Sequence, residues 1–494
     1  MKIFLKQIPN LILLFVTVFS LNSCSKNASK TPASISGWGK NDAQGWLFTG
    51  DNPPSSKIHN GMVFVRGGAF IMGKITEDVL MDFTNTPKRT SVQSFLLAEN
   101  EVTNFDYLQY ISWLEYIFPK ENPASKLIIR GASPNKAVWK KDSNISDVIG
   151  KEYFIHPAYS HYPVVGVTWI QAQRYCDWLT DRVNEKSLIN KGVIKGDLYT
   201  DPKLLNPNNI FSSSAFDANP KELAKDSLSI IDSTKIYGNN NSQSINSRAI
   251  YKTYGNNVVS AFRLPTEAEW EFAATGISAK KTGKVNIYKG EEVFYKQMLG
   301  KKVSKKGKIA SKFKQGISNG AHSLNRASLT NQVKSMPAND FGLYGMFGNV
   351  SEWVQDSYKV VIEDRNINSA TVDEDSNYEY DSNGRMKKIG FNDIKFDTMS
   401  DGRVVYKDLP GDFIVKPASP VIKDSTSVDV TRLKKSSDLT TYVKEDSKVI
   451  KGASWKDNSY WVDPGQRRFL SEGRSTDWVG FRVAQDSSTE DSKK

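Results

Sequence analysis

The chain of 494 residues alternates between short segments with a regular apolar pattern and long polar stretches. The patterned segments begin near residue 62 and end near residue 484, and the stretches between them run for tens of residues. With 39% hydrophobic and 11% aromatic residues, the chain has enough apolar side chains to fill a core. We therefore expect a globular protein interrupted by long polar segments, and not a disordered chain.

Local patterns predict both strands and helices in this core. Residues 62–73 predict two short strands around a Gly-Gly turn. Apolar residues recur at helical spacing over 104–118, and Thr103 is placed to cap that helix. Thr266 followed by Glu269 forms a capping box, which predicts the start of another helix. The expected fold class is therefore α+β.

A central segment combines a predicted strand with a predicted helix. The apolar run over 162–167 predicts a buried strand. It leads into a capping box made by Thr168 and Gln171, after which apolar residues recur on one helical face. Cys176 lies on that face, so we expect it to be a core residue.

The N-terminus has the pattern of an exported lipoprotein. An apolar run over 11–21 follows two lysines and is too short to span a bilayer, so it predicts a signal-peptide core. The sequence LNSC ending at Cys24 reads as a lipobox, whose cysteine is lipid-modified; a chance cysteine near a cleavage site is the alternative. Residues 1–23 are predicted to be the signal peptide, and 24–60 a lipid-anchored flexible tether.

The net charge of +12 does not indicate nucleic-acid binding. An exported protein is separated from the nucleic acids of the cell. In addition, the lysines are scattered or bunched over 279–314, without the interleaved aromatic residues that a single-strand binder would need. That bunch is expected to be a solvated loop, with a docking patch for an acidic partner or phospholipid headgroups as the alternative. Cys176 cannot pair with an acylated Cys24, so the fold must rely on burial and not on a disulfide.

Four longer motifs occur in a fixed order. They are HPAYSHYPVVGVTW from His156, RLPTEAEWEFAA from Arg263, FGLYGMFGNVSEW from Phe341, and GASW to GFRVA from Gly452. In wording and order they resemble the formylglycine-generating (sulfatase-modifying) enzyme superfamily. The resemblance implies an α+β, C-type-lectin-like fold with little regular secondary structure.

The resemblance covers a domain over 61–485, followed by a tail over 486–494 that is expected to be disordered. Relative to a compact member, this domain carries four insertions, near 119–155, 186–250, 277–330 and 357–447. Loops of that length are uncommon unless they have a role, so we expect interaction surfaces that order on a partner, above all over 357–447. Tolerated surface growth is the alternative. Replacement of 357–447 by a short linker is expected to leave the core folded.

The two active-site cysteines of the superfamily are missing. In the superfamily these cysteines follow a GGS-type turn. When this chain is aligned on Ser454, the two cysteine positions hold Asp457 and Val462. The thiolate is both the copper ligand and the sulfur nucleophile of that chemistry. We therefore predict that the protein is not an enzyme, that it has no catalytic residues, and that Ser454, Asp457 and Val462 are former active-site positions.

The resemblance also implies a calcium site, which is weakened here. Its ligands in the superfamily are a side chain after LY, two backbone carbonyls and a glutamate, which correspond to Gly345, Gly348, Val350 and Glu352. Gly345 has no side-chain oxygen, so calcium affinity should fall or a water must fill the gap. The alternative is that Glu352 keeps the loop in shape by accepting backbone hydrogen bonds. Calcium is the one cofactor left open.

Within the superfamily, the chain is most similar to the gliding-motility lipoproteins of Bacteroidetes, the GldJ and GldK family. The segments that carry this similarity include HPAY from His156 and TDRVNE from Thr180. It implies a periplasm-facing, lipid-anchored outer-membrane protein that assembles the gliding machinery and the type IX secretion system. Its partners would be other lipoproteins of that system, GldK-like ones included, and outer-membrane components.

Two other functional classes stay open. The first is a cell-wall or glycan-binding lectin-like module, which would use aromatic side chains near the former active site: Trp455, Tyr460, Trp461 and Trp478. The second is an enzyme with altered metal-dependent oxidase chemistry, which would have to bind a metal. One fold hosts many functions, so the fold does not choose among the three.

Overall fold

The computed structural model describes most of the predicted domain. The described residues are 61–73, 87–118, 120–139, 149–190, 192–194, 207, 210–218, 260–275, 329–336, 338–339, 341–359, 378–399, 402–406, 410–414, 443, 446–457 and 459–487. The predicted signal peptide with Cys24, the tether, the lysine-rich stretch over 279–314 and the tail beyond 487 lie outside them. Among the described residues, no helix is long and apolar enough to cross a membrane.

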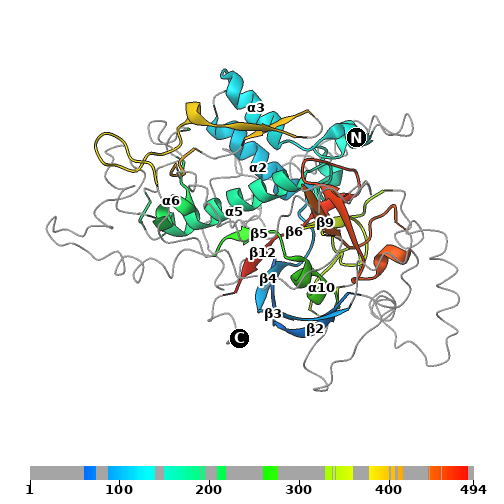
Figure 1. Ribbon diagram of the computed structural model, residues 1–494. Coiled ribbons are helices and arrows are strands. Elements are labelled where there is room, and N and C mark those ends of the chain that lie inside the picture. Colours follow the sequence, from blue (N-terminus) through cyan, green and yellow to red (C-terminus); the bar gives the residue numbers. More distant parts are fainter. Residues whose placement is uncertain are drawn as a thin grey trace, which may run out of the picture. The chain divides into compact units, whose positions relative to one another are not determined.

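Two four-stranded sheets form the centre of the domain (Figure 1). One sheet has the order β1 (Met62–Val65), β4 (Phe95–Ala98), β12 (Ala484–Asp486) and β5 (Phe262–Arg263), and all its pairs are antiparallel. The other has the order β10 (Arg467–Ser471), β9 (Ser447–Lys451), β6 (Ser351–Ser357) and β11 (Val479–Phe481), of which only β6 and β11 pair in parallel. The first and last described strands therefore lie in one sheet.

Two smaller hairpins complete the strands of the described residues. They are β2 (Gly68–Met72) with β3 (Lys88–Val92), and β7 (Phe396–Thr398) with β8 (Val404–Tyr406). The two strands predicted over 62–73 are present, but they do not form a hairpin with each other, because β1 pairs with β4. The chain between them runs against residues 92–94: a Cβ at Gly67 would lie 2.3 Å from the carbonyl oxygen of Val92.

Five α-helices with bounds inside the described residues lie between and around the sheets, and residues 149–152 are also helical. The five are α2 (Asn104–Ile117), α3 (Pro123–Ala132), α5 (Trp169–Asn190), α6 (Ser213–Ala218) and α10 (Glu267–Thr275). Short 3₁₀ turns are η1 (Lys136–Trp139), η2 (Pro157–Tyr159), η4 (Phe391–Asp393) and η5 (Ser459–Val462). The capping boxes predicted before α5 and α10 are confirmed, and Thr103 caps α2 in a box with Asp106.

The strand predicted over 162–167 is wrong. The segment is buried, but its only ladder contact in the described residues is a single bridge between Pro163 and Thr103. Gly166 has a φ of +78°, and a Cβ there would lie 2.7 Å from the carbonyl oxygen of Asn135. This left-handed turn against a neighbouring backbone ends any regular pairing.

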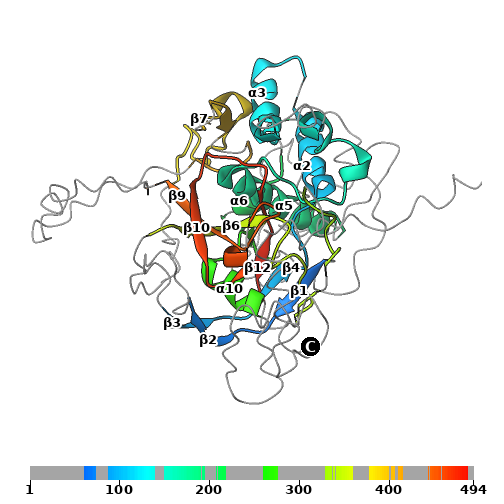
Figure 2. The same ribbon diagram turned by 90° about the vertical axis from the view of Figure 1, so that its right-hand side faces the viewer.

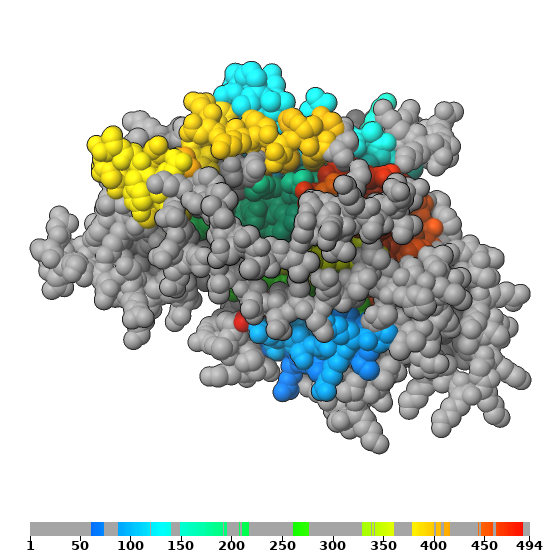
Figure 3. Space-filling view, viewed as in Figure 1, coloured from blue at the N-terminus to red at the C-terminus, as the bar shows by residue number. Residues whose placement is uncertain are grey.

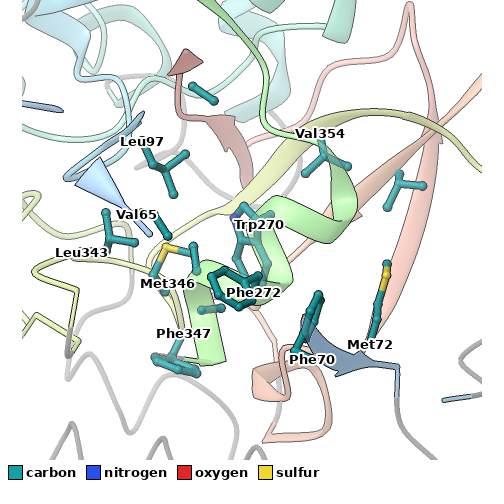
Figure 4. Close-up of a cluster of buried hydrophobic side chains, with 14 of the residues drawn as sticks. Val65, Phe70, Met72, Leu97, Trp270, Phe272, Leu343, Met346, Phe347 and Val354 are labelled. Atoms are coloured by element: carbon teal, nitrogen blue, oxygen red, sulfur yellow. The ribbon is translucent and has the colours of Figure 1, made fainter. Parts of the chain in front are cut away.

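The main hydrophobic core lies around α10. Trp270 and Phe272 of α10 lie among side chains of β1, β2, β4 and the loop after residue 341 (Figure 4). The ring of Phe70 meets Phe272 edge to face, with centroids 5.3 Å apart. Cys176 of α5 is buried as a free thiol, which confirms its predicted core role.

Parts of two insertions pack together on the helices. We call the described residues of 120–139 and 378–414 the insertion layer. Both views place α3 and the β7 region on one side of α2 and α5, with β1 to β4 on the other (Figure 1, Figure 2). Phe391 stacks on Phe118 at 5.4 Å, and the hydroxyl groups of Tyr110 and Tyr406 are hydrogen-bonded. The described part of the 357–447 insertion is therefore packed on α2 and contributes to the fold.

Candidate functional site

The former active-site tract begins where β9 ends. Gly452 has a φ of +76°, and a Cβ there would lie 2.9 Å from the indole of Trp270, so glycine suits this turn in both conformation and space. The carbonyl of Gly452 accepts a hydrogen bond of 2.8 Å from the Ser351 hydroxyl of β6. The turn that carries the following residues is therefore fixed to the central sheet.

Asp457 stands at the first former cysteine position and is fully engaged. Its Oδ2 accepts hydrogen bonds from the backbone N–H and the hydroxyl of Ser454, at 2.6 and 2.7 Å. Arg468 of β10 donates to both carboxylate oxygens at 2.7 Å, which makes a bidentate ion pair. Bidentate pairs of this kind are among the strongest polar contacts in proteins. Both carboxylate oxygens are therefore held by hydrogen bonds within the chain.

Arg468 is the centre of this network. Its Nη2 also donates to the Ser351 hydroxyl at 2.5 Å and to the Gly452 carbonyl at 3.1 Å. The guanidinium lies over the rings of Trp461 and Trp478, at 4.4 and 4.6 Å from their centroids. Cation–π contacts of this kind stabilise an arginine that is partly removed from water. The arrangement holds one arginine tightly in place.

Val462 stands at the second former cysteine position, within η5. It is 6% exposed and belongs to the hydrophobic cluster around Trp270. A valine there offers no ligand atom and no nucleophile. The structure thus brings Ser454 and Asp457 into contact and places Val462 in the core.

The 119–155 insertion covers one side of this tract. Trp139 of η1 stacks on Trp455 at 6.3 Å between ring centroids, with 18° between the ring planes. Tyr153 packs on Trp139 at 4.8 Å, and its hydroxyl donates to the carbonyl of Pro163. These rings form a second hydrophobic cluster beside the former active site. Trp455, one of the candidate glycan-stacking aromatics, therefore packs internally.

The other candidate glycan-binding aromatics are also occupied where the structure describes them. Trp461 and Trp478 each lie against the guanidinium of Arg468. The side chain of Tyr460 lies outside the described residues. Sugar rings bind to open aromatic faces, and these indoles already use a face for the arginine. Sequence reasoning missed Arg468, because nothing in the local pattern links residue 468 to residue 457.

The candidate calcium loop is held by an ion pair. Glu352 of β6 accepts 2.6 Å hydrogen bonds from Arg482 at each of its two oxygens, and Oε2 also accepts one from the Trp270 indole at 2.7 Å. Both side chains of the pair are fully buried. Gly345 has a φ of +73°, as the loop turns toward Gly348 and Val350. The proposed carboxylate ligand is therefore already bound to a cation of the chain itself.

Glu101 occupies the space beside Gly345. A Cβ at Gly345 would lie 2.2 Å from Oε1 of Glu101, so this carboxyl group fills the region into which a side chain at 345 would project. Burial raises the pKa of Glu101 to about 7, Arg482 lowers it and Glu352 raises it. Its Oε1 accepts from the Asn349 amide at 3.2 Å, and Oε2 has no hydrogen-bond partner among the described residues.

This arrangement does not fit a calcium ion held as the resemblance implies. An ion bound by Glu352 would lie beside the Arg482 guanidinium, which repels it and competes for the same two oxygens. No cluster of three metal-ligating side chains of the His, Cys, Asp and Glu types occurs in the part of the chain that the structure describes. We derive no chemistry from calcium at this loop.

The fold and these motifs define the family. The chain belongs to the family of sulfatase-modifying factor enzyme 1-like (FGE-sulfatase) domains, which matches residues 49–487. Its architecture is the mixed helix and sheet of a C-type-lectin-like fold with little regular secondary structure, as predicted.

Two curated relatives match this chain over less than a third of their own length. A serine/threonine-protein kinase pkn1 of Chlamydia caviae is 25% identical over 297 residues, which are 60% of this chain and 28% of that protein. The pkn1 of Chlamydia pneumoniae is 23% identical over 314 residues, which are 62% and 29% of the two chains. The chain therefore spans less than a third of the length of these relatives.

Solved structures of low sequence identity are also similar. Treponema denticola variable protein 1 has a TM-score of 0.34 at 17% identity, covering 86% of this chain and 95% of that one. PvdO from Pseudomonas aeruginosa has a TM-score of 0.33 at 15% identity, with coverages of 86% and 94%. CarF has a TM-score of 0.32 at 15% identity, covering 86% of this chain and 98% of that one.

Proposed function

We propose that the protein is a non-catalytic outer-membrane lipoprotein that serves as an assembly component of the gliding machinery and the type IX secretion system. The observation that supports the non-catalytic part is the pairing of Asp457 with Arg468 beside a buried Val462. Where the superfamily needs two thiols, this chain holds a closed ion pair and a core residue. A site organised in this way stabilises a fold and leaves no group free to react.

The proposed gliding role rests on sequence similarity. The HPAY and TDRVNE segments resemble GldJ more than GldK, so we propose a GldJ-type protein of Bacteroidetes. Polar residues of TDRVNE hold the 186–250 insertion: Asp181 accepts from the Ser213 backbone N–H at 2.7 Å, and the Asn184 amide donates to the Ser213 hydroxyl at 3.0 Å. The segment that points to this family thus binds an added part of the domain.

We also propose that the loop over 345–352 works without calcium. The Arg482 guanidinium takes the place of a cation beside Glu352, and Glu101 fills the volume that Gly345 leaves open. Thermal melting of the purified protein tests this. The melting temperature should be the same in a chelator and in excess calcium, and a rise with calcium would show that the ion is retained.

Anchoring is tested by substitution of the predicted lipidated residue. Cys24→Ala should leave the protein in the soluble periplasmic fraction or as an inner-membrane precursor. The matched control is Cys176→Ala, which changes the other cysteine and should stay in the outer-membrane fraction. If Cys24→Ala still fractionates with the outer membrane and supports secretion, the lipoprotein assignment is wrong.

The assembly role is tested in cells. Loss of the protein should abolish gliding and the secretion of cell-surface adhesins together, and the wild-type chain should restore both. Two biochemical measurements separate the other classes. Copper, iron or zinc near one per chain would support an enzyme, and retention on purified cell wall would support a glycan-binding module.

A further inference from the structure

The outer face of α3 combines an exposed apolar side chain with two exposed cations. Its exposed positions are spaced as one helical face: Pro123, Lys126, Leu127 and Arg130. Leu127 is 40% exposed, which makes it one of the few large apolar side chains that the described residues leave in solvent. Helices that bind proteins present apolar anchor residues, and arginine is enriched at such interfaces.

From residue 122 to residue 139 the cations of this region have no acidic neighbour in the sequence. Within the described residues, four exposed basic side chains make no ion pair: Lys120, Lys126, Arg130 and Lys136. Some lysines elsewhere on the surface do pair, as Lys334 does with Glu99 and Lys448 with Glu472. The α3 face thus carries a local positive charge that no ion pair within the described residues neutralises.

The helix is fixed rigidly beneath this face. A Cβ at Gly131 would lie 2.0 Å from the carbonyl oxygen of Val404, so α3 and β8 touch through their backbones. The Gln171 side chain of α5 donates to the Gly131 carbonyl at 2.6 Å, and Arg403 donates to the Ser133 carbonyl at 2.6 Å. A surface held in one conformation loses little entropy when a partner binds.

We propose that the exposed face of α3 is a docking surface for an acidic protein partner, with Leu127 as the apolar anchor and Lys126 and Arg130 as the flanking charges. Figure 3 shows α3 in cyan at the edge of the molecule, beside the yellow segment that begins at residue 378. The carboxylates of such a partner would complete the ion pairs that α3 lacks. The face belongs to the 119–155 insertion, so the proposal places a partner contact there.

A membrane surface is the less suitable occupant. A helix that binds in the lipid interface inserts a broad apolar face among the acyl chains. On α3 that face is turned inward, since Ser125, Ile128, Gly131 and Ala132 are buried in the domain. Leu127 alone remains for lipid, and one leucine with two cations gives only weak membrane affinity. The observations therefore favour a folded acidic surface.

Site-specific photocrosslinking in living cells tests the proposal with the full-length protein. A photoreactive amino acid replaces Leu127, and in a control strain it replaces Ile71 of β2, which is exposed to a similar degree at 42%. We expect a discrete protein adduct at position 127 and none of the same mass at position 71. Mass spectrometry of the adduct should place the crosslink in a segment rich in Asp and Glu.

Charge reversal provides the second arm. Lys126→Glu with Arg130→Glu should lower the adduct yield at least about tenfold, because like charges then face each other. The matched control, Arg66→Glu with Lys359→Glu, reverses two exposed cations elsewhere and should keep the yield. Both variants must match the wild type in abundance and melting temperature, and Lys126→Gln with Arg130→Gln replaces the first if it does not fold. No protein adduct, a lipid adduct, or a yield that survives charge removal would each overturn the proposal.

Discussion

The cationic side chains of the former active site form ion pairs within the chain, whereas those on the outer face of α3 form none within the described residues. In the core, Arg467, Arg468 and Arg482 each bind a carboxylate at 2.6 to 2.8 Å. On α3, Lys126 and Arg130 are exposed and make no ion pair with any described residue. Charges satisfied within the chain stabilise one fold, whereas charges left without partners are available for binding. Under our proposals, the former active site stabilises the fold, and α3 in the 119–155 insertion recognises a partner.

The largest effect is expected where a core pair is broken. Arg482→Met leaves Glu352 buried without its cation, which should lower the free energy of unfolding by about 3–5 kcal/mol. Urea denaturation measures this loss. Adding Glu352→Gln removes the stranded charge while keeping an acceptor for the Trp270 indole, so the double variant should recover part of the stability. A loss below about 1 kcal/mol in the single variant would contradict the structural role of the pair.

The next effect tests whether the insertion layer belongs to the fold. Phe391→Ala removes a buried ring that stacks on Phe118, so we expect a loss of about 3 kcal/mol. Asn392→Ala changes the exposed neighbour and should stay within about 0.5 kcal/mol of the wild type. Chemical denaturation compares the two. Equal stability of both variants would mean that the layer is peripheral, as the sequence suggested for 357–447.

A smaller effect probes the space beside Gly345. Asparagine tolerates positive φ, so Gly345→Asn mainly tests the contact with Glu101, and we expect a loss of about 1–3 kcal/mol. In a Glu101→Ala background the same substitution should cost less than about 1 kcal/mol, because the clashing carboxyl group is gone. A double-mutant cycle gives this coupling. Additive losses would show that Glu101 does not occupy the site.

A further effect concerns pH at the joint between α5 and α6. Burial raises the pKa of Asp181 to about 8, with Arg182 lowering it and Asp412 raising it. Between about pH 4 and pH 8 the folded state therefore holds a proton that the unfolded state has lost, so this group's contribution to stability falls as pH rises.

Asp181→Asn removes that titration and keeps an acceptor for the Ser213 N–H. The difference in melting temperature, variant minus wild type, should be a few degrees more positive at about pH 8 than at about pH 5. Thermal melting at the two pH values provides the measurement. A difference that does not change with pH would contradict the shifted pKa.

Local signals explain which parts of this structure the sequence could predict. The capping boxes at Thr168 and Thr266 depend on residues three apart, and both are present. The pairing of β1 with β4 depends on strands about thirty residues apart, which no hairpin signal describes. The buried segment near Gly166 reads as a strand because its apolar run hides a left-handed turn. Periodicity predicts elements, and contacts between distant segments decide their partners.

The site shows the same division. The absence of both thiols is a prediction from the sequence, because alignment on Ser454 puts Asp457 and Val462 at the two cysteine positions. The ion pair at this position joins Asp457, in the loop after β9, to Arg468 of β10, and Glu101 reaches Gly345 from the segment just before α2. Such contacts follow from the fold and not from spacing along the chain. The sequence could therefore predict what is absent from the site but not what fills it.

Adhesin secretion per folded molecule, measured in cells, tests the central comparison most directly. One strain carries Asp457→Asn with Arg468→Gln, which neutralises the former active site, and the other carries Lys126→Glu with Arg130→Glu on α3. We expect the first strain to secrete in proportion to the folded protein it retains, and the second to lose secretion at normal abundance and melting temperature. Loss of secretion in the first strain at wild-type abundance and stability, with normal secretion in the second, would contradict the account.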